Sequence, residues 1–369
     1  METINLLGNP ASPHVRHWEM VLTRCNMRPT VYGIAHHIKE PALVQCAHMI
    51  GPAWAQYLPA TLAYLLAGVW LRYRAFLGRH RILFVHAHNT SGYGLIAWLS
   101  GIPYGVTTYG SEIYAAPRKS ILYKFIISRI LHDAKFITSA SPQMTKTLRQ
   151  QFKVPSEKIK EIYLGISPEF KYSEESRRNA RAQLNIKDSD LVWMANRRIH
   201  ELYQTLDLVR AFKKFSEKNH AGHLILIEGD ADFKYIKEVE SEIGLNSRIH
   251  ILRGFLPQSH LCKWLCAADF SISIPRSDQL SSSILEAMQC RAIPVLGNLP
   301  AYQALDTVPE WVDLCNGNIQ GNLEMMFKIT SKYTENQLAE KRKIVIQTIS
   351  VITKDDSIRN SFHELYLSK

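Results

Sequence analysis

The sequence has few of the features that would set it apart from ordinary globular proteins. Its six cysteines are spread over 369 residues, which is too sparse for a fold stapled by disulfides. The first ten residues include Glu2 and no long apolar stretch, so we expect no secretory signal peptide. There is no internal repeat and no recognised nucleic-acid-binding motif, and the basic residues are dispersed. We therefore expect no nucleic-acid partner.

A metal site has little support in the sequence. Cys262 and Cys266 stand four residues apart in a segment with a helical pattern. Two ligands alone do not close a zinc site. We predict reduced, buried thiols here and no metal.

Charge is missing from residues 41–71, which contain no Asp, Glu, Lys or Arg. The part from 53 to 71 is long enough to suggest a transmembrane helix, but Gln56, Pro59 and Thr61 interrupt its apolar character. We predict a core helix, with one face touching lipid as an alternative. Four arginines follow and either meet acidic head groups or form a solvated helix end: Arg72, Arg74, Arg79 and Arg81.

The overall composition is that of a protein with a sizeable core and an anionic partner. Hydrophobic residues make up 46% of the chain, and 44 Lys and Arg stand against 33 Asp and Glu, a formal net charge of +11. Such an excess favours nucleic acid, acidic lipid or a phosphorylated small molecule, without choosing among them.

Short apolar runs alternate with helical patterns along almost the whole sequence. One series of candidate strands covers residues 4–7, 82–86, 104–108, 136–140 and 160–164, and a second covers 191–195, 223–228, 248–252, 270–274 and 292–296. Alternating strands and helices predict parallel sheets covered on both faces. Two series predict an α/β protein of two doubly wound, Rossmann-like domains.

The domain boundary is predicted after Gly165, where a polar, charged segment separates the two series. We expect domains at residues 1–168 and 169–350, and a C-terminal helix, 351–369, that returns to the first domain. Ligands of open parallel sheets bind beyond the carboxyl ends of the strands. The natural site is therefore a central cleft which the two domains face.

The most informative segment is residues 274–296, IPRSDQLSSSILEAMQCRAIPVL. After a strand, a polar loop with Asp278 and three serines, Ser281, Ser282 and Ser283, leads into a helix that carries Glu286. Free backbone N–H groups and the positive end of a helix dipole suit a phosphate, and Glu286 can accept hydrogen bonds from a ribose. The alternative is that the serines and Glu286 merely cap the helix.

This segment resembles the donor-binding signature of the retaining GT-B glycosyltransferases of family 4. That family has an acidic residue, seven spacers and a Glu, then an EAM-type helix and a PVL-type strand; Asp278 and Glu286 have this spacing. The family usually has Glu at the first position. The resemblance implies that Glu286 holds the ribose and that Asp278 and the serine loop lie near the sugar and the phosphates.

A second stretch, ANRRIHELYQTLDLVRAF, is similar to the family segment with an Arg and a Lys five residues later. The resemblance places Arg198 on that Arg, whose forked guanidinium suits a diphosphate; a plain surface arginine is the alternative. Tyr203 stands where the Lys is expected and supplies no cation. Arg197 or His200 are candidates to compensate. Further along, Gly229 and Gly254 correspond to places where the backbone approaches the nucleotide, or are simple turns.

The N-terminal half resembles the acceptor side of the family. His86 and His88 share one face of a strand, and a lone histidine there would more often be satisfied core. Tyr109 and Glu112 follow the next strand, with Glu112 either orienting an acceptor hydroxyl or capping a helix. The early loop GNPASPHVRHW offers three candidate contacts to phosphate or acceptor: His14, Arg16 and His17.

The resemblance implies transfer of a sugar from a nucleotide-sugar to a hydroxyl of a glycan or lipid-linked acceptor, with retention and without a metal or other cofactor. We expect a role in cell-surface polysaccharide or lipopolysaccharide synthesis, in the cytoplasm or at the inner face of the plasma membrane. A sugar-nucleotide epimerase or hydrolase on the same fold is one alternative. A non-catalytic protein that binds glycan or nucleic acid is another.

Overall fold

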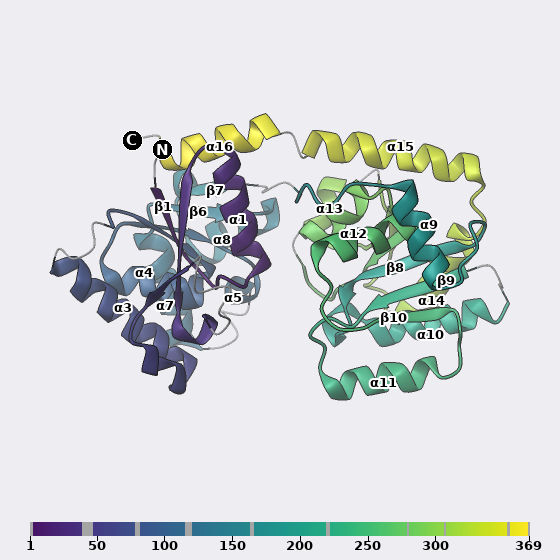
Figure 1. Ribbon diagram of the computed structural model, residues 1–369, viewed down its shortest axis with the longest axis horizontal. Coiled ribbons are helices and arrows are strands. Elements are labelled where there is room, and N and C mark those ends of the chain that lie inside the picture. The colour runs from purple at the N-terminus through teal and green to yellow at the C-terminus, as the bar shows by residue number, and fades with distance from the viewer. Residues whose placement is uncertain are drawn as a thin grey trace. The chain divides into compact units, whose positions relative to one another are not determined.

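The computed structural model describes residues 3–38, 47–77, 82–114, 120–162, 166–218, 222–278, 280–305, 308–352 and 355–367. The chain divides into two compact units, one of residues 1–164 and 355–369 and the other of residues 165–354. The boundaries expected from the sequence, at 168 and 350, lie four residues from these. The expected hinge residue, Gly165, lies outside the described residues. Figure 1 shows both units.

The first unit is built on a seven-stranded sheet in the order β3-β2-β1-β4-β5-β6-β7, with each strand parallel to its neighbours. The chain therefore reverses its direction of winding between the neighbouring strands β1 and β4. The strands are β1 (Thr3–Leu7), β2 (Arg28–Ile34), β3 (Ala47–Ile50), β4 (Val85–His88), β5 (Tyr104–Thr107), β6 (Phe136–Ser139) and β7 (Ile159–Glu161).

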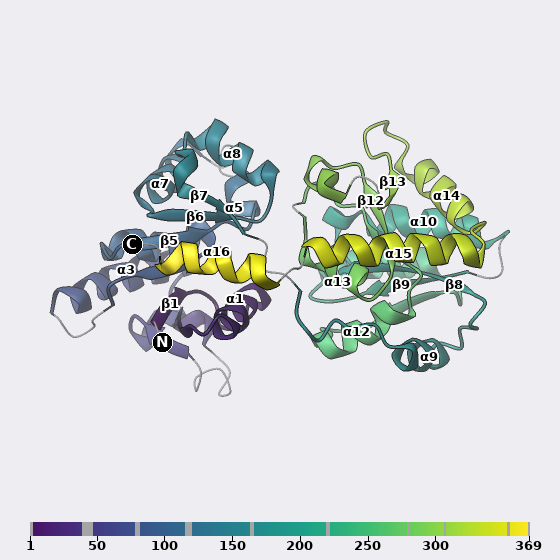
Figure 2. The same cartoon turned by 90° about the horizontal axis from the view of Figure 1, so that it is seen from above.

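Helices cover both faces of this sheet, as parallel strands that are buried on both sides require. One face carries α3 (Ala60–Phe76), α4 (Gly94–Ser100), α7 (Ile121–Asp133) and α8 (Pro142–Phe152), whose apolar residues share one core. The other carries α1 (Pro13–Arg24) and α16 (Asp355–Leu367). Trp18 of α1 meets Phe362 of α16 with ring centroids 4.9 Å apart, so the end of the chain closes the core of the first unit. Figure 2 shows α16 beside α1. Short elements complete the unit: η1 (Ala35–His37), η2 (Ala53–Tyr57), the π-helical η3 (Asn89–Tyr93), α5 (Ser111–Tyr114) and η4 (Ser156–Lys158).

The second unit has a six-stranded parallel sheet in the order β10-β9-β8-β11-β12-β13, and its winding reverses between β8 and β11. The strands are β8 (Leu191–Arg198), β9 (Gly222–Ile227), β10 (Ile249–Leu252), β11 (Phe270–Ser273), β12 (Ile293–Gly297) and β13 (Glu310–Val312). The helices are α9 (Glu174–Gln183), α10 (Thr205–Ser216), α11 (Phe233–Ile243), α12 (Gln258–Ala267), α13 (Ser282–Gln289), α14 (Ile319–Thr330) and α15 (Glu335–Ile352), with η5 (Glu201–Tyr203) and η6 (Pro300–Leu305).

Three strands of the structure were not predicted from the sequence. They are β2, which opens with Arg28 and Pro29, β3 and the three-residue β13. The last two lie at sheet edges and are only partly buried, so their sequences lack the continuous apolar run that signals a central parallel strand.

Residues 53–71, the apolar part of the uncharged segment, lie in two helices instead of one. Pro59 separates η2 from α3, which buries Ala63, Ala67 and Leu71 against the core and leaves Val69 58% exposed. In the described parts of the chain, no helix is long and apolar enough to cross a membrane.

Candidate functional site

The strand order of the second unit brings together the two segments that the sequence singled out. β8 ends at Arg198, and β11 is followed by a loop with Asp278 that leads through Ser281 into α13, which begins with Ser282 and Ser283. These strands are neighbours although β9 and β10 intervene in sequence. Their carboxyl ends flank the point where the winding reverses, which is where open α/β sheets bind ligands. We call this set of residues the serine-turn cluster: Arg197, Tyr203, Asp278, Ser281, Ser282, Ser283 and Glu286.

The serines do not cap the helix in the way that the alternative interpretation required. Ser281 stands at the N-cap of α13 in extended conformation (φ −81°, ψ 144°) but its side chain makes no capping hydrogen bond. Its hydroxyl instead lies 2.8 Å from that of Ser283. Glu286 is the fifth residue of the helix and not the third, so it does not occupy the position of a capping box. The first turn therefore keeps N–H groups that a ligand can use.

Arg197 holds the serine-turn cluster together. Its guanidinium donates to Ser283 Oγ at 3.0 Å and to the Tyr203 hydroxyl at 2.9 Å, and it lies 3.4 Å from a carboxylate oxygen of Asp278. Tyr302 donates to the same carboxylate at 2.9 Å. Burial lowers the pKa of Arg197, but Asp278 and Tyr203 outweigh that effect and raise it. The cluster thus contains a permanent cation beside a carboxylate and the start of a helix.

Glu286 is a partly buried carboxyl group in the field of Arg197. Burial raises its pKa to about 7, against a smaller opposing effect of Arg197. Near neutral pH the group exists in both protonation states, so it can accept and donate hydrogen bonds. Such a carboxyl group suits a ligand with adjacent hydroxyls.

Arg198, for which the resemblance predicts a contact with the diphosphate, has another partner in the structure. It forms an ion pair with Asp230 at 2.5 Å, while its neighbour Arg197 donates to Ser283. The pairing of β8 with β9 shifts register between Ala195 and Arg198. No contact of Arg198 with the serine turn is found in the described residues.

Gly229 and Gly254 lie together where β9 and β10 end. Gly229 donates its N–H to the carbonyl oxygen of Gly254 at 3.1 Å, and Gly254 donates to Glu228 at 2.8 Å. Both have left-handed backbones, with φ of 63° and 72°. A Cβ on Gly229 would lie 2.7 Å from Cβ of Arg198, whereas space around Gly254 is open. The left-handed backbone favours glycine at both positions, and at Gly229 there is also no space for a side chain.

In the first unit, His88 and Tyr109 meet beyond the carboxyl ends of β4 and β5, and β4 also borders the point where the winding reverses. His88 Nδ1 lies 2.6 Å from the Tyr109 hydroxyl, and the ring of exposed His14 stacks on Tyr109 at 4.7 Å. Burial lowers the pKa of His88 to about 3 and, with Glu112, raises that of Tyr109 well above 10, so both side chains stay neutral. His88 Nε2 is buried and has no hydrogen-bond partner among the described residues.

His86 belongs to the core and not to the site. Its side chain is fully buried, with Nε2 2.8 Å from Thr107 Oγ1 and Nδ1 bonded to the Tyr366 hydroxyl. The two histidines do share a face, with centroids 4.9 Å apart, but α16 covers the first of them.

Two of the remaining predicted acceptor residues, Glu112 and Arg16, have local partners. Buried Glu112 accepts the backbone N–H of Tyr109 at 2.8 Å, which favours the capping interpretation. Arg16 is exposed and donates to the carbonyl oxygen of Pro10 at 3.1 Å. Burial lowers the pKa of His17 to about 4.

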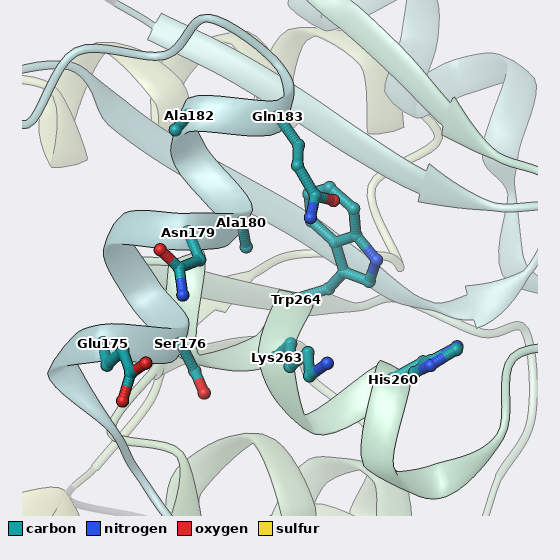
Figure 3. Close-up of a pocket in the computed structure, with 9 residues that line it drawn as sticks. All are labelled: Glu175, Ser176, Asn179, Ala180, Ala182, Gln183, His260, Lys263 and Trp264. Carbon is teal, nitrogen blue, oxygen red and sulfur yellow. The ribbon is translucent and has the colours of Figure 1, made fainter.

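A separate groove of about 610 Å³ lies between α9 and α12 (Figure 3). Polar side chains and one indole line it: Glu175, Ser176, Asn179, Gln183, His260, Lys263 and Trp264. It shares no residue with the serine-turn cluster.

Comparisons with known proteins bear on the fold of the two units. Residues 14–170 match the family model Glycosyltransferase Family 4. The matched residues make up less than half of the chain. No curated protein matches the sequence.

Among solved structures, HepE from Anabaena in complex with UDP and glucose has a TM-score of 0.79 at 16% identity, with both chains covered over 100% of their length. Sucrose-phosphate synthase from Thermosynechococcus elongatus has a TM-score of 0.77 at 16% identity, covering 100% of this chain and 98% of that one. WaaG, a glycosyltransferase of lipopolysaccharide biosynthesis, has a TM-score of 0.73 at 13% identity, over 99% and 100%. These likenesses show the GT-B fold.

Proposed function

We propose that this protein transfers a sugar from a nucleotide-sugar to an acceptor hydroxyl with retention at the anomeric carbon. The observation that carries the proposal is the serine-turn cluster, in which a partly buried cation, a helix start and a carboxyl group lie at the reversal point of the second sheet. HepE is described in complex with UDP-glucose, which supports a UDP-sugar as the first donor to test.

Arg197 supplies the positive charge that a lysine at position 203 would supply. As the sugar departs, negative charge grows on the leaving phosphate, and preorganised donors at that place lower the barrier. Tyr203 has no charge of its own, but its hydroxyl and ring orient Arg197, at 2.9 Å and 4.6 Å from the centroid. The fork of Arg197 and the N–H groups at the start of α13 would bind the diphosphate. With these groups we expect transfer to need no divalent metal.

Glu286 and Asp278 act on the rest of the donor. A carboxyl group with a pKa of about 7 can bind a ribose diol in either protonation state. Asp278, held by Tyr302 and Arg197, would face the transferred sugar.

On the acceptor side, we assign His88, Tyr109 and His14. The unpartnered Nε2 of His88 is a neutral polar atom that a hydroxyl can satisfy, and an unsatisfied buried polar atom is costly. The stack of His14 on Tyr109 supplies an aromatic wall.

The acceptor is proposed to be a lipid-linked or growing surface glycan at the inner face of the plasma membrane. The helices α3 and α7 pack on the same core, and each exposes large apolar side chains: Leu62, Leu65, Val69, Tyr73, Phe76, Ile121, Leu122 and Phe125. Phe76 is 87% exposed and Ile121 91%. Exposed Arg72 and Lys124 lie beside them and complement anionic head groups. The description of WaaG also names lipopolysaccharide biosynthesis.

A thermal-shift screen of nucleotide-sugars tests the proposed function, since a true donor raises the Tm by mass action. We expect one nucleoside diphosphate sugar to stabilise the chain and to be hydrolysed slowly without acceptor, in the presence of EDTA. If no nucleotide or nucleotide-sugar shifts the Tm at millimolar concentration, the proposal fails.

A further inference from the structure

Three cysteines from two helices meet inside the second unit. Cys262 and Cys266 stand one turn apart on the buried face of α12, and Cys290 follows the last residue of α13. Their sulfur atoms all lie within 4.8 Å of one another, and those of Cys262 and Cys290 are 3.8 Å apart. The sequence showed only the pair on α12. The packing of α13 against α12 adds the third thiol.

A backbone carbonyl oxygen lies close enough to these sulfur atoms to serve as a fourth ligand atom. The oxygen of Lys171 lies 3.4 Å from the sulfur of Cys262 and 3.7 Å from that of Cys266. Tetrahedral zinc with Zn–S of about 2.3 Å and Zn–O of about 2.1 Å has ligand atoms about 3.8 Å apart for two sulfurs and about 3.6 Å for sulfur and oxygen. The distances from Cys262 to Cys290 and from the Lys171 oxygen to Cys262 and Cys266 agree with that tetrahedron, and the other sulfur pairs lie within 4.8 Å.

The surroundings suit an anionic metal centre. Zinc with three thiolates carries a net charge of −1, which burial disfavours unless positive charge is near. Asp269, two residues after the end of α12, is bound by three arginines, Arg177, Arg181 and Arg342, at 2.8, 2.8 and 2.6 Å. Glu174 and Asp188 also interact with these arginines. Arg177 donates to the carbonyl oxygens of Cys266 and Ala267 at 3.3 and 3.2 Å, so a guanidinium group adjoins the cysteines.

We propose that Cys262, Cys266, Cys290 and the Lys171 carbonyl form a closed structural site for Zn²⁺. The three thiols release their protons as the metal binds. The ion ties α12, the segment around Lys171 and the end of α13 to one another. Because α13 also carries Ser283 and Glu286, the metal fixes the position of the helix that bears the serine-turn cluster. Its role is structural and does not depend on the proposed transfer reaction.

The test is metal analysis of the full chain purified under reducing conditions. We expect about one zinc per chain, retained through gel filtration, and a lower Tm after chelation that recovers on adding Zn²⁺. Replacement by Co²⁺ should give an intense thiolate-to-cobalt charge-transfer band. Cys262→Ser and Cys290→Ser should each lose the zinc. The matched controls, buried Cys25→Ser and exposed Cys315→Ser, should keep it.

If a serine variant does not fold, the cobalt–thiolate band of the unaltered chain tests whether the metal site exists. A chain whose thiols all titrate as free, and which gives neither a cobalt–thiolate band nor a Tm shift with Zn²⁺, overturns the proposal. A disulfide between Cys262 and Cys290 in freshly reduced protein overturns it as well. The donor screen is read separately, so loss of zinc and loss of donor binding are distinguishable.

Discussion

The guanidinium of Arg197 lies over the ring of Tyr203, 4.6 Å from its centroid, and donates to its hydroxyl at 2.9 Å. Tyr203 stands where the resemblance to family 4 predicts a lysine. We propose that Arg197, at the end of β8, supplies the cation that this lysine would provide. The tyrosine keeps it in place by cation–π attraction and a hydrogen bond.

Arg197→Ala should lower kcat/KM for the donor by about 10² to 10³, the usual loss when one preorganised donor to a developing anion is removed. Arg198→Ala is the matched control, because its partner is the largely exposed Asp230, and it should change kcat/KM only a few-fold. Steady-state kinetics on both variants check this. Equal losses in the two would mean that Arg197 does not face the phosphates.

Tyr203→Phe should weaken donor binding about five- to tenfold, since one hydrogen bond that orients Arg197 is lost, at about 1 kcal/mol. Tyr203→Lys should alter the rate or the preference among nucleotide-sugars, because it places a second cation beside Arg197. Isothermal titration with the donor and a competition assay measure the two effects. An unchanged donor profile for Tyr203→Lys would place this side chain away from the phosphates.

Glu286→Gln should weaken donor binding and yet stabilise the free protein at high pH. The folded protein holds the Glu286 proton up to a pKa of about 7, against an ordinary value of 4.5. The unfolded chain ionises first, so stability falls as pH rises from about 4.5 to 7. The loss is on the order of 3 kcal/mol.

Urea unfolding at pH 5 and pH 8 measures this difference. The variant should gain stability over the unaltered protein mainly at pH 8. A gain that is equal at both pH values would show that Glu286 has an ordinary pKa.

Replacing His86 should lower the stability of the protein, whereas replacing His88 should lower its transfer activity. His86→Ala removes two buried hydrogen bonds and core volume, and should destabilise the first unit by about 2 to 4 kcal/mol. His88→Asn should leave stability and donor hydrolysis nearly unchanged and reduce transfer to the acceptor. Unfolding curves and separate assays of hydrolysis and transfer distinguish the two. Full transfer activity in a folded His88→Asn protein contradicts the assignment of His88.

The double variant Val69→Ser, Phe76→Ser should reduce sedimentation with vesicles that contain anionic lipid, because each change removes exposed apolar area from α3. Leu245→Ser is the control, since Leu245 is fully exposed but lies in the second unit, at the end of α11. High salt should weaken binding further through Arg72 and Lys124. Equal retention of all variants would remove the case for α3 as the lipid-facing element.

Much of the site was readable in the sequence because its signals are local. The serine turn, the helix after it and the spacing of Asp278 and Glu286 lie within one short segment. The alternation of strands and helices is likewise a local pattern, since a buried parallel strand needs a continuous apolar run. These features predicted an α/β protein with a binding turn in its second half.

What the sequence by itself determined is therefore the set of elements and the chemistry at each strand end. The tertiary structure decided which of these groups meet. Arg197 and not Arg198 contacts Ser283, and α16, far along the chain, buries His86 beneath Tyr366. Packing of α13 on α12 brings Cys290 to Cys262. Such contacts depend on strand register and helix docking, which are set by the whole core and leave no local mark in the sequence.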